Sequence, residues 1–164
     1  MSRTLIKHAF LTSLPVLAGY VVLGTGFGIL LRNAGYGLPW SLAMAVFIYA
    51  GSMQYVGIGL LTSGASLLSA ALTTFMVNAR HLFYSISMIG TYKDAGKYKP
   101  YLIFALTDET YSLLCGGKAP EGTDPNLYRF LVSAFNHCYW ITGCVLGSLL
   151  GAVLRFPQWG SNSQ

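Results

Sequence analysis

The stretch SLLSAALTTFMVNARHLFYSISMIGTY, residues 66–92, is long enough to cross a bilayer and carries Arg80 and His81 within its apolar run. A transmembrane helix needs about 20 residues, and an arginine at its centre costs about 2.5 to 3.5 kcal/mol on insertion scales. Arg80 and His81 are therefore candidate functional residues that face protein or trapped water, and Asn78 adds an amide that needs a partner. Alternatively, the span ends at residue 79, Arg80 extends to the lipid headgroups and His81 packs as a neutral aromatic side chain.

The composition is that of an integral membrane protein. Of 164 residues, 54% are hydrophobic and 9% are charged, whereas soluble domains carry about 25% charged residues. Asp, Glu, Lys and Arg are absent from His8 to Leu31, from Asn33 to Ala79 and from Phe130 to Leu154. We predict an all-α integral membrane protein, a single polytopic domain over residues 1–164, with about five hydrophobic segments. These lie at about residues 13–31, 40–62, 66–90, 100–117 and 128–154.

The formal net charge of +5 comes from basic residues that flank the apolar runs, as juxtamembrane residues do. No basic patch with interleaved aromatic residues occurs, so we exclude nucleic-acid binding. Residues 3–14 have an apolar face opposite Arg3 and Lys7, which predicts a short lead-in at the membrane interface rather than a cleaved signal peptide.

The segment at residues 40–62 carries Gly51, Ser52 and Gln54 at its middle, within the motif YAGSMQY. These residues weaken a helix at mid-membrane depth. One interpretation is close packing between helices through small residues. The other is a broken helix whose freed backbone groups line a cavity.

The distribution of lysines favours an interrupted segment. With five simple crossings and a cytoplasmic N-terminus, the lysine-rich stretch 93–99 falls outside the cell, against the positive-inside tendency. A re-entrant element between residues 40 and 90 would place both basic regions in the cytoplasm. We therefore predict that at least one segment is broken or re-entrant.

A second ionisable pair, Asp108 and Glu109, lies within the apolar segment 100–117. Adjacent residues on a helix point about 100° apart because a turn holds 3.6 residues, so the two carboxyl groups have different neighbours. One is predicted to pair with Arg80 and the other to face a cavity and titrate. The alternative is a segment broken at Thr107, with Asp108 as the N-cap of a second half-helix at the surface.

Small residues recur in the first and last segments. Gly24 and Gly28 are four residues apart, and Gly143, Gly147 and Gly151 repeat the same spacing. This spacing predicts close contact with another helix. We find no convincing internal repeat in the sequence.

The cysteines show no metal-ligand spacing with His137, so we predict no metal and no cofactor. His137 is more typical of a packed residue or of one that hydrogen-bonds between helices.

Several motifs together resemble one family. With these motifs in order, the chain from residue 5 to about 155 resembles the AzlC family, the large subunits of bacterial branched-chain amino acid exporters. The resemblance implies a multi-pass protein of the bacterial inner membrane, a branched-chain amino acid substrate and a small AzlD-type membrane partner. Family members continue with further apolar spans, so we expect this chain to lack their C-terminal spans. The motifs are PVLAGY (15–20), GTGFG (24–28), YAGSMQY (49–55), VNARHLFY (77–84) and TDETY (107–111).

We predict the permease subunit of a valine, leucine and isoleucine exporter that works by secondary transport, and not an enzyme. The predicted coupling residues are Asp108 and Glu109. An intramembrane enzyme with His81 as base is disfavoured because no nucleophile or metal motif has a recognisable spacing. A truncated, non-transporting scaffold is the other alternative. The predicted substrate-binding residues are Gly51, Ser52, Gln54, Asn78, Arg80 and His81.

Overall fold

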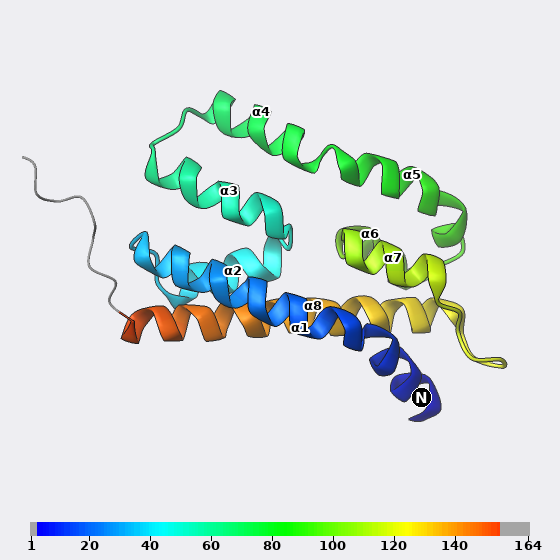
Figure 1. The fold of residues 1–164 in the computed structure, drawn as a ribbon. Helices are drawn as coiled ribbons and strands as arrows, with labels where there is room; N and C mark the ends of the chain where they lie inside the picture. Colours follow the sequence, from blue (N-terminus) through cyan, green and yellow to red (C-terminus); the bar gives the residue numbers. More distant parts are fainter. Residues whose placement is uncertain (1–2, 155–164) are drawn as a thin grey trace, which may run out of the picture.

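The computed structural model describes residues 3–154, and within that range the regular structure is helical (Figure 1). This confirms the predicted all-α class. The elements in chain order are α1 (Arg3–Asn33), α2 (Leu38–Phe47), α3 (Gly51–Thr62), α4 (Leu67–Asn78), α5 (Arg80–Tyr92), a 3-10 turn η1 (Gly96–Tyr98), α6 (Lys99–Phe104), α7 (Asp108–Gly116) and α8 (Pro125–Val153).

Two long helices, α1 and α8, run parallel and form the base of the molecule (Figure 1). Their backbones touch because glycines face one another: a Cβ added at Gly24 would lie 2.9 Å from the Cys144 nitrogen, and one at Gly28 would overlap the Cys144 carbonyl oxygen. Gly143 and Gly147 meet the backbone of α1 in the same way. The glycine spacing thus serves contact between helices of this chain, and α1 is one continuous helix from Arg3.

The segment predicted at residues 40–62 is a helical hairpin. Helix α2 runs antiparallel to α8, where the Ser41 hydroxyl donates to the Cys144 carbonyl oxygen at 3.0 Å. The chain then reverses at Tyr49, whose φ of 45° is rare for a residue other than glycine, and α3 returns to the end from which α2 came (Figure 1). The prediction of a broken or re-entrant segment is confirmed.

Helices α4 and α5 continue in one direction across the molecule, and the helical pattern is interrupted at Ala79 (Figure 1). This break places Arg80 and His81 at the first positions of α5. Arg80 therefore sits midway along the α4–α5 path, so the alternative in which it extends from the end of a shorter span to the headgroups does not hold.

The segment predicted at residues 100–117 is also a hairpin, which enters from the opposite end to α2–α3 (Figure 1). Helix α6 approaches the centre, where the Tyr101 hydroxyl lies 3.1 Å from Nδ1 of His137, and α7 leads back. His137 Nε2 also lies 3.1 Å from the Ala45 carbonyl oxygen, so this histidine joins α2, α6 and α8. The break is at Thr107, as in the alternative above, but the cap is Thr107 rather than Asp108 and it lies at the centre of the molecule.

The same pattern, a crossing helix followed by a hairpin, thus occurs twice in opposite directions. Helix α1 leads to the α2–α3 hairpin, and α4–α5 leads to the α6–α7 hairpin. In each case a tyrosine on the returning helix bonds the crossing helix: Tyr55 donates to the Leu23 carbonyl oxygen, and Tyr111 bonds the Ser87 hydroxyl at 3.1 Å.

The two ends of the molecule differ in charge. His8 contacts the Lys118 carbonyl oxygen at 3.1 Å, and Asn126 donates to that of Asp94 at 3.0 Å, so these loops and the start of α1 share one end, here called the basic end. The loops at the opposite end, 34–37 and 63–66, carry no charged residue. The basic end carries Arg3, Lys7, Lys93, Lys97, Lys99, Lys118 and Arg129.

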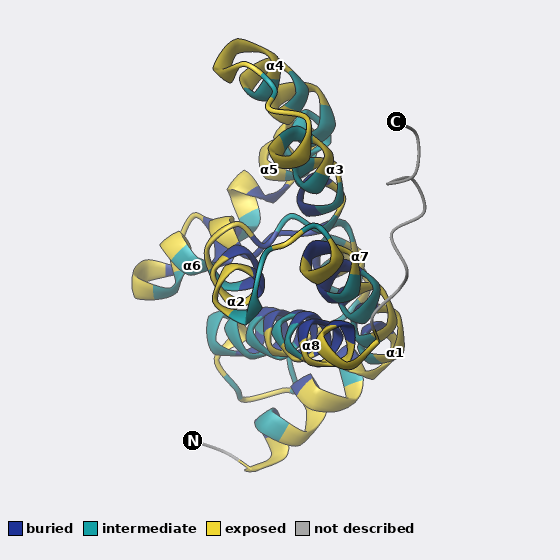
Figure 2. Ribbon diagram, turned by 90° about the vertical axis from the view of Figure 1, so that its left-hand side faces the viewer, coloured by how far each residue is buried: buried dark blue, intermediate teal, exposed yellow. Residues whose placement is uncertain are grey.

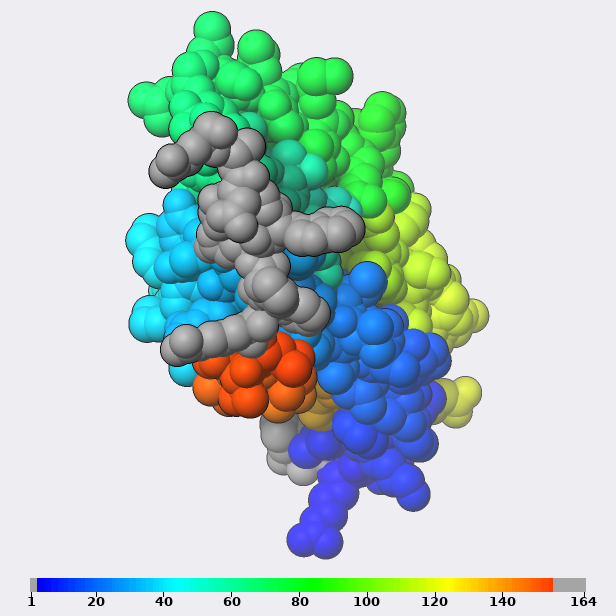
Figure 3. Space-filling model, turned by 60° about the vertical axis from the view of Figure 1, so that its left-hand side comes forward, coloured from blue at the N-terminus to red at the C-terminus, as the bar shows by residue number. Residues whose placement is uncertain are grey.

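The outer surface is apolar, as lipid contact requires. No residue of α4 is buried, and its Leu67 and Met76 are 91% and 76% exposed. Figure 2 shows exposed residues of α4 and α5 on the outside of the molecule. Figure 3 shows the last turns of α8 against α1 and α2, on the side of the molecule away from α4 and α5. Among the described residues, α1 and α8 are each long and apolar enough to cross a membrane.

The α1–α8 contact predicts a position-specific effect of small substitutions. Gly28→Ala places a methyl group against the backbone of α8 and should destabilise the protein by roughly 1 to 3 kcal/mol through overpacking. Thermal unfolding of the detergent-purified protein measures the loss. Gly19→Ala on the same helix meets nothing within 4 Å and is the control; equal stability of the two variants would contradict the contact.

Candidate functional site

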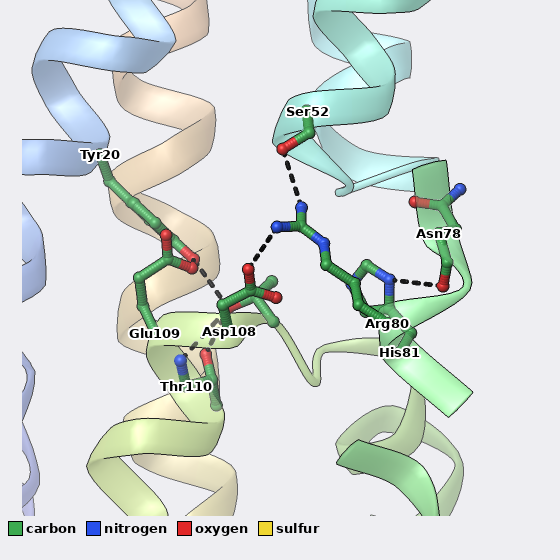
Figure 4. A network of polar contacts seen from close by, with 9 residues as sticks. Tyr20, Ser52, Asn78, Arg80, His81, Asp108, Glu109 and Thr110 are labelled. Atoms are coloured by element: carbon green, nitrogen blue, oxygen red, sulfur yellow. Dashed lines mark hydrogen bonds and ion pairs between the residues drawn. The ribbon is translucent and has the colours of Figure 1, made fainter. Parts of the chain in front are cut away.

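Three helix breaks meet at the centre of the molecule. The first two residues of α3, α5 and α7 all line one cavity there, so each break delivers a pair of side chains to the same place. Figure 4 shows the arginine of α5 between the serine of α3 and the aspartate of α7. The pairs are Gly51 and Ser52, Arg80 and His81, and Asp108 and Glu109.

Arg80 joins the three elements. Its Nη1 donates to Oδ2 of Asp108 in an ion pair, and its Nη2 donates to the Ser52 hydroxyl at 2.8 Å. The arginine and aspartate side chains are 40% and 33% exposed, so the pair faces an accessible cavity rather than a sealed core. The predicted pairing of one acid with Arg80 is what the structure shows.

Glu109 points to the other side of α7, toward α1. Its Oε2 accepts a hydrogen bond from the Tyr20 hydroxyl at 2.7 Å, and the same hydroxyl lies 2.7 Å from the hydroxyl of Thr107 (Figure 4). Thr107 in turn caps α7 by accepting from the Thr110 nitrogen at 3.3 Å. The two neighbouring acids therefore have separate partners, one cationic and one neutral.

Helix α8 fixes both hairpins through one face. Asn136 donates to the Thr110 hydroxyl at 3.0 Å, and Trp140, one turn later, donates to Oε1 of Gln54 at 2.8 Å. Residues four apart lie on the same side of a helix. All four side chains are buried, with at most 3% exposure, so these bonds form away from water and hold the starts of α3 and α7 in register.

The cavity has a volume of about 200 Å³, which is room for several water molecules or one small solute. Its walls are mixed: Leu23, Tyr55 and Trp140 supply apolar surface beside the charged groups. Tyr49, a residue 3% exposed, also lines it, and its buried hydroxyl has no hydrogen-bond partner among the described residues.

The predicted site residues fall into two groups. Gly51, Ser52, Arg80 and His81 line the cavity, as do both acids. Gln54 does not line it; this residue is fully buried and supports α3 through Trp140. Asn78 lines an adjoining cavity, and its carbonyl oxygen lies 3.2 Å from Nδ1 of His81.

Sequence reasoning missed the aromatic residues of the cavity. Tyr20, Tyr49 and Trp140 line it, but an aromatic residue in an apolar run has no distinguishing pattern. Tyr20 and Tyr49 each lie at an end of a motif quoted above, PVLAGY and YAGSMQY, and that position is the signal that could have indicated them.

The electrostatics of the cavity suit a solute with both charges. A helix N-terminus carries roughly half a positive charge, and the starts of α3 and α7 line the cavity together with the Arg80 guanidinium. Helix α5 follows directly on α4 through Ala79, so the C-terminal end of the α4 dipole offsets the start of α5. The two helix starts and the guanidinium attract an anion such as a carboxylate. Asp108 and Glu109 attract a cation such as an ammonium group.

Interrupted helices around a polar cavity, in a molecule with an apolar exterior, are typical of an integral membrane protein. A family model described as AzlC protein matches residues 15–154. The chain therefore belongs to the AzlC family, a family of membrane transport proteins.

The chain is similar to proteins from several bacteria. It is 37% identical over 154 residues to the branched-chain amino acid transport protein AzlC of Bacillus subtilis (strain 168), which covers 94% of this chain and 61% of that protein. It is 41% identical to an uncharacterized membrane protein of Helicobacter pylori (strain ATCC 700392 / 26695), with 94% and 68% covered. The inner membrane protein YgaZ of Escherichia coli (strain K12) is 29% identical, with 87% and 59% covered.

The chain spans about three fifths to two thirds of the length of these relatives. No solved structure matched it.

The Arg80–Asp108 ion pair predicts energetic coupling between α5 and α7. Arg80→Gln and Asp108→Asn each leave a charge without its partner, so each should destabilise the protein. The double variant removes both charges and should lose less than the sum, with a coupling energy on the order of 1 kcal/mol. Thermal unfolding in detergent gives the values.

Ser52→Ala is the control for this cycle, because it removes one hydrogen bond to Arg80 and leaves the ion pair in place. Strict additivity of Arg80→Gln and Asp108→Asn would show that the two charges do not interact in the folded protein.

Proposed function

We propose that this protein is the permease subunit of a branched-chain amino acid exporter, which carries valine, leucine or isoleucine by secondary transport. The observation that supports the proposal is the convergence of three helix breaks, one guanidinium and two carboxyl groups on one cavity at the centre of an apolar molecule. The name of the Bacillus subtilis relative supports the choice of substrate.

Each part of a branched-chain amino acid has a matching part of the cavity. The carboxylate binds near Arg80 and Ser52, where the start of α3 adds partial positive charge. The ammonium group binds the carboxyl group of Asp108 or of Glu109. The aliphatic side chain lies against Leu23 and other apolar walls.

We assign the coupling proton to the two acids. Asp108 is held by Arg80, and a substrate carboxylate that binds Arg80 competes for the same guanidinium nitrogens. Glu109, hydrogen-bonded by Tyr20, faces the cavity without a cationic partner among the described residues. Binding of the substrate thus changes the charge balance around a carboxyl group, which is the requirement for coupling solute movement to proton movement.

The proposal includes a partner and a membrane. A small AzlD-type subunit completes the exporter, and the bacterial inner membrane is its location, in agreement with the name of the Escherichia coli relative. The basic end is cytoplasmic by the positive-inside tendency. In this arrangement α1, α4–α5 and α8 cross the membrane, while α2–α3 and α6–α7 enter from opposite sides and return.

Valine efflux from proteoliposomes that hold the chain with its small partner tests the transport function. Under an imposed pH gradient, Asp108→Asn and Glu109→Gln should each lower proton-driven efflux about tenfold or more, because an amide cannot bind and release the proton. Glu121→Gln, in the loop before α8, is the matched control and should transport normally. Unchanged efflux in both cavity variants would reject the assignment.

Complementation separates a transporter from a scaffold. In a strain that lacks its branched-chain exporter, the chain with its partner should restore resistance to a toxic leucine analogue. A scaffold would reach the membrane and leave the strain sensitive.

The membrane arrangement is tested with single cysteines in a variant without the three native cysteines. Ser63→Cys, in the loop between α3 and α4, should react with a membrane-impermeant thiol reagent added to intact spheroplasts. Lys93→Cys, after α5, should react only in inside-out vesicles. Reaction of both from the same side would contradict the crossing of α4–α5.

A further inference from the structure

A second cavity adjoins the central cavity on one side. The second cavity has a volume of about 230 Å³ and shares Tyr49, Ala50 and His81 with the first as a common wall. Tyr49 is the residue at the strained turn of the first hairpin, and His81 is at the start of α5. Residues at two of the helix breaks therefore stand between the two spaces.

A third cavity, of about 150 Å³, extends the second toward the basic end. It shares Ser85, Ile103 and Leu106 with the second, and Lys99 lies in its wall at the start of α6. The three cavities form one series from the Arg80 site to the lysine-rich end. We refer to the second and third cavities together as the α5–α6 groove.

The groove is built by one face of each helix. On α5 its wall residues His81, Ser85, Met88 and Tyr92 are three or four residues apart, which places them on one side of the helix. Helix α6 and the tip after it repeat this spacing with Lys99, Ile103 and Leu106. The groove is therefore a consequence of how two helices pack along their whole length.

Aromatic rings pack on the opposite side of the central cavity. Phe27, which is fully buried, lies edge-on to Tyr55 at 5.8 Å and stacks on Trp140 at 6.4 Å between ring centroids. Tyr55 donates a hydrogen bond to the Leu23 carbonyl oxygen, and Trp140 donates one to Gln54. Leu23, which is 53% exposed, lines the cavity beside this cluster.

We propose that the α5–α6 groove is the water-filled passage by which the substrate reaches the central cavity from the basic end, an inference that rests on the proposed transport function. Its chemistry fits a small zwitterion with an aliphatic side chain. The walls are mainly apolar, and the hydroxyl group of Ser85 supplies an isolated polar contact.

Cysteine labelling tests the passage. In the variant without native cysteines, Ser85→Cys lies in the groove, and Ile86→Cys lies at the same depth on the outer apolar face of α5; both residues are exposed, so the comparison reports whether water or lipid covers each face. A membrane-impermeant methanethiosulfonate reacts with thiols in water and not with thiols in lipid. In inside-out vesicles Ser85→Cys should react about tenfold or more faster than Ile86→Cys, and saturating valine should slow the reaction.

Equal rates for the two variants, or reaction of Ser85→Cys only from the other side of the membrane, would overturn the proposed passage. The efflux assay then separates the two proposals. If unmodified Ser85→Cys exports valine and the modified protein does so equally well, the groove is not the route, although the transport function stands. If the unmodified protein exports no valine, the transport function fails and the labelling rates alone decide whether the groove holds water.

Discussion

A peptide group that leaves a helix inside a bilayer has no water to bond with, and this constraint governs the whole structure. The chain breaks its helices before Gly51, Arg80 and Asp108, and all three breaks come to the same place. Grouping them lets one polar chamber serve all the freed groups, while the outer surface stays apolar. The helix breaks and the cavity therefore occur together, because the cavity holds the polar backbone groups that the breaks leave unpaired.

Helix α8 holds the elements around the cavity in place. Its glycines bring it against α1, and on another face Asn136 and Trp140 hold the starts of α7 and α3. His137, between them in sequence, bonds α2 and stacks on Tyr49 at 4.1 Å between ring centroids. The positive φ of Tyr49 is an unfavourable conformation, and this packing from α8 is what maintains it.

The sequence predicted the charged residues of the site and not its architecture, for physical reasons. Arg80, Asp108 and Glu109 are conspicuous because charge inside an apolar run is costly. A hairpin and a crossing of similar length have the same hydropathy, so the direction of α3 and α7 was not predictable from composition. Gln54 was predicted to bind substrate, but it supports α3 from behind: it lies two residues after Ser52, about 200° further round the helix, and bonds Trp140. The pattern of a crossing helix followed by a hairpin is repeated in the opposite direction along the molecule. No repeat in the sequence accompanies it.

The two sides of the central cavity differ in the contacts that hold their helices together. Toward the end without charged loops, Tyr55 and Trp140 are fixed by hydrogen bonds to a backbone and a side-chain oxygen, and Phe27 packs against both rings. Toward the basic end, the contact between α5 and α6 leaves a groove, and Arg80 is the element that ties α5 to both hairpins. In the proposed function, a solute carboxylate that binds Arg80 competes with those ties. The proposal thus gives one side chain two roles, recognition of the anionic group and attachment of α5, and so links binding to rearrangement.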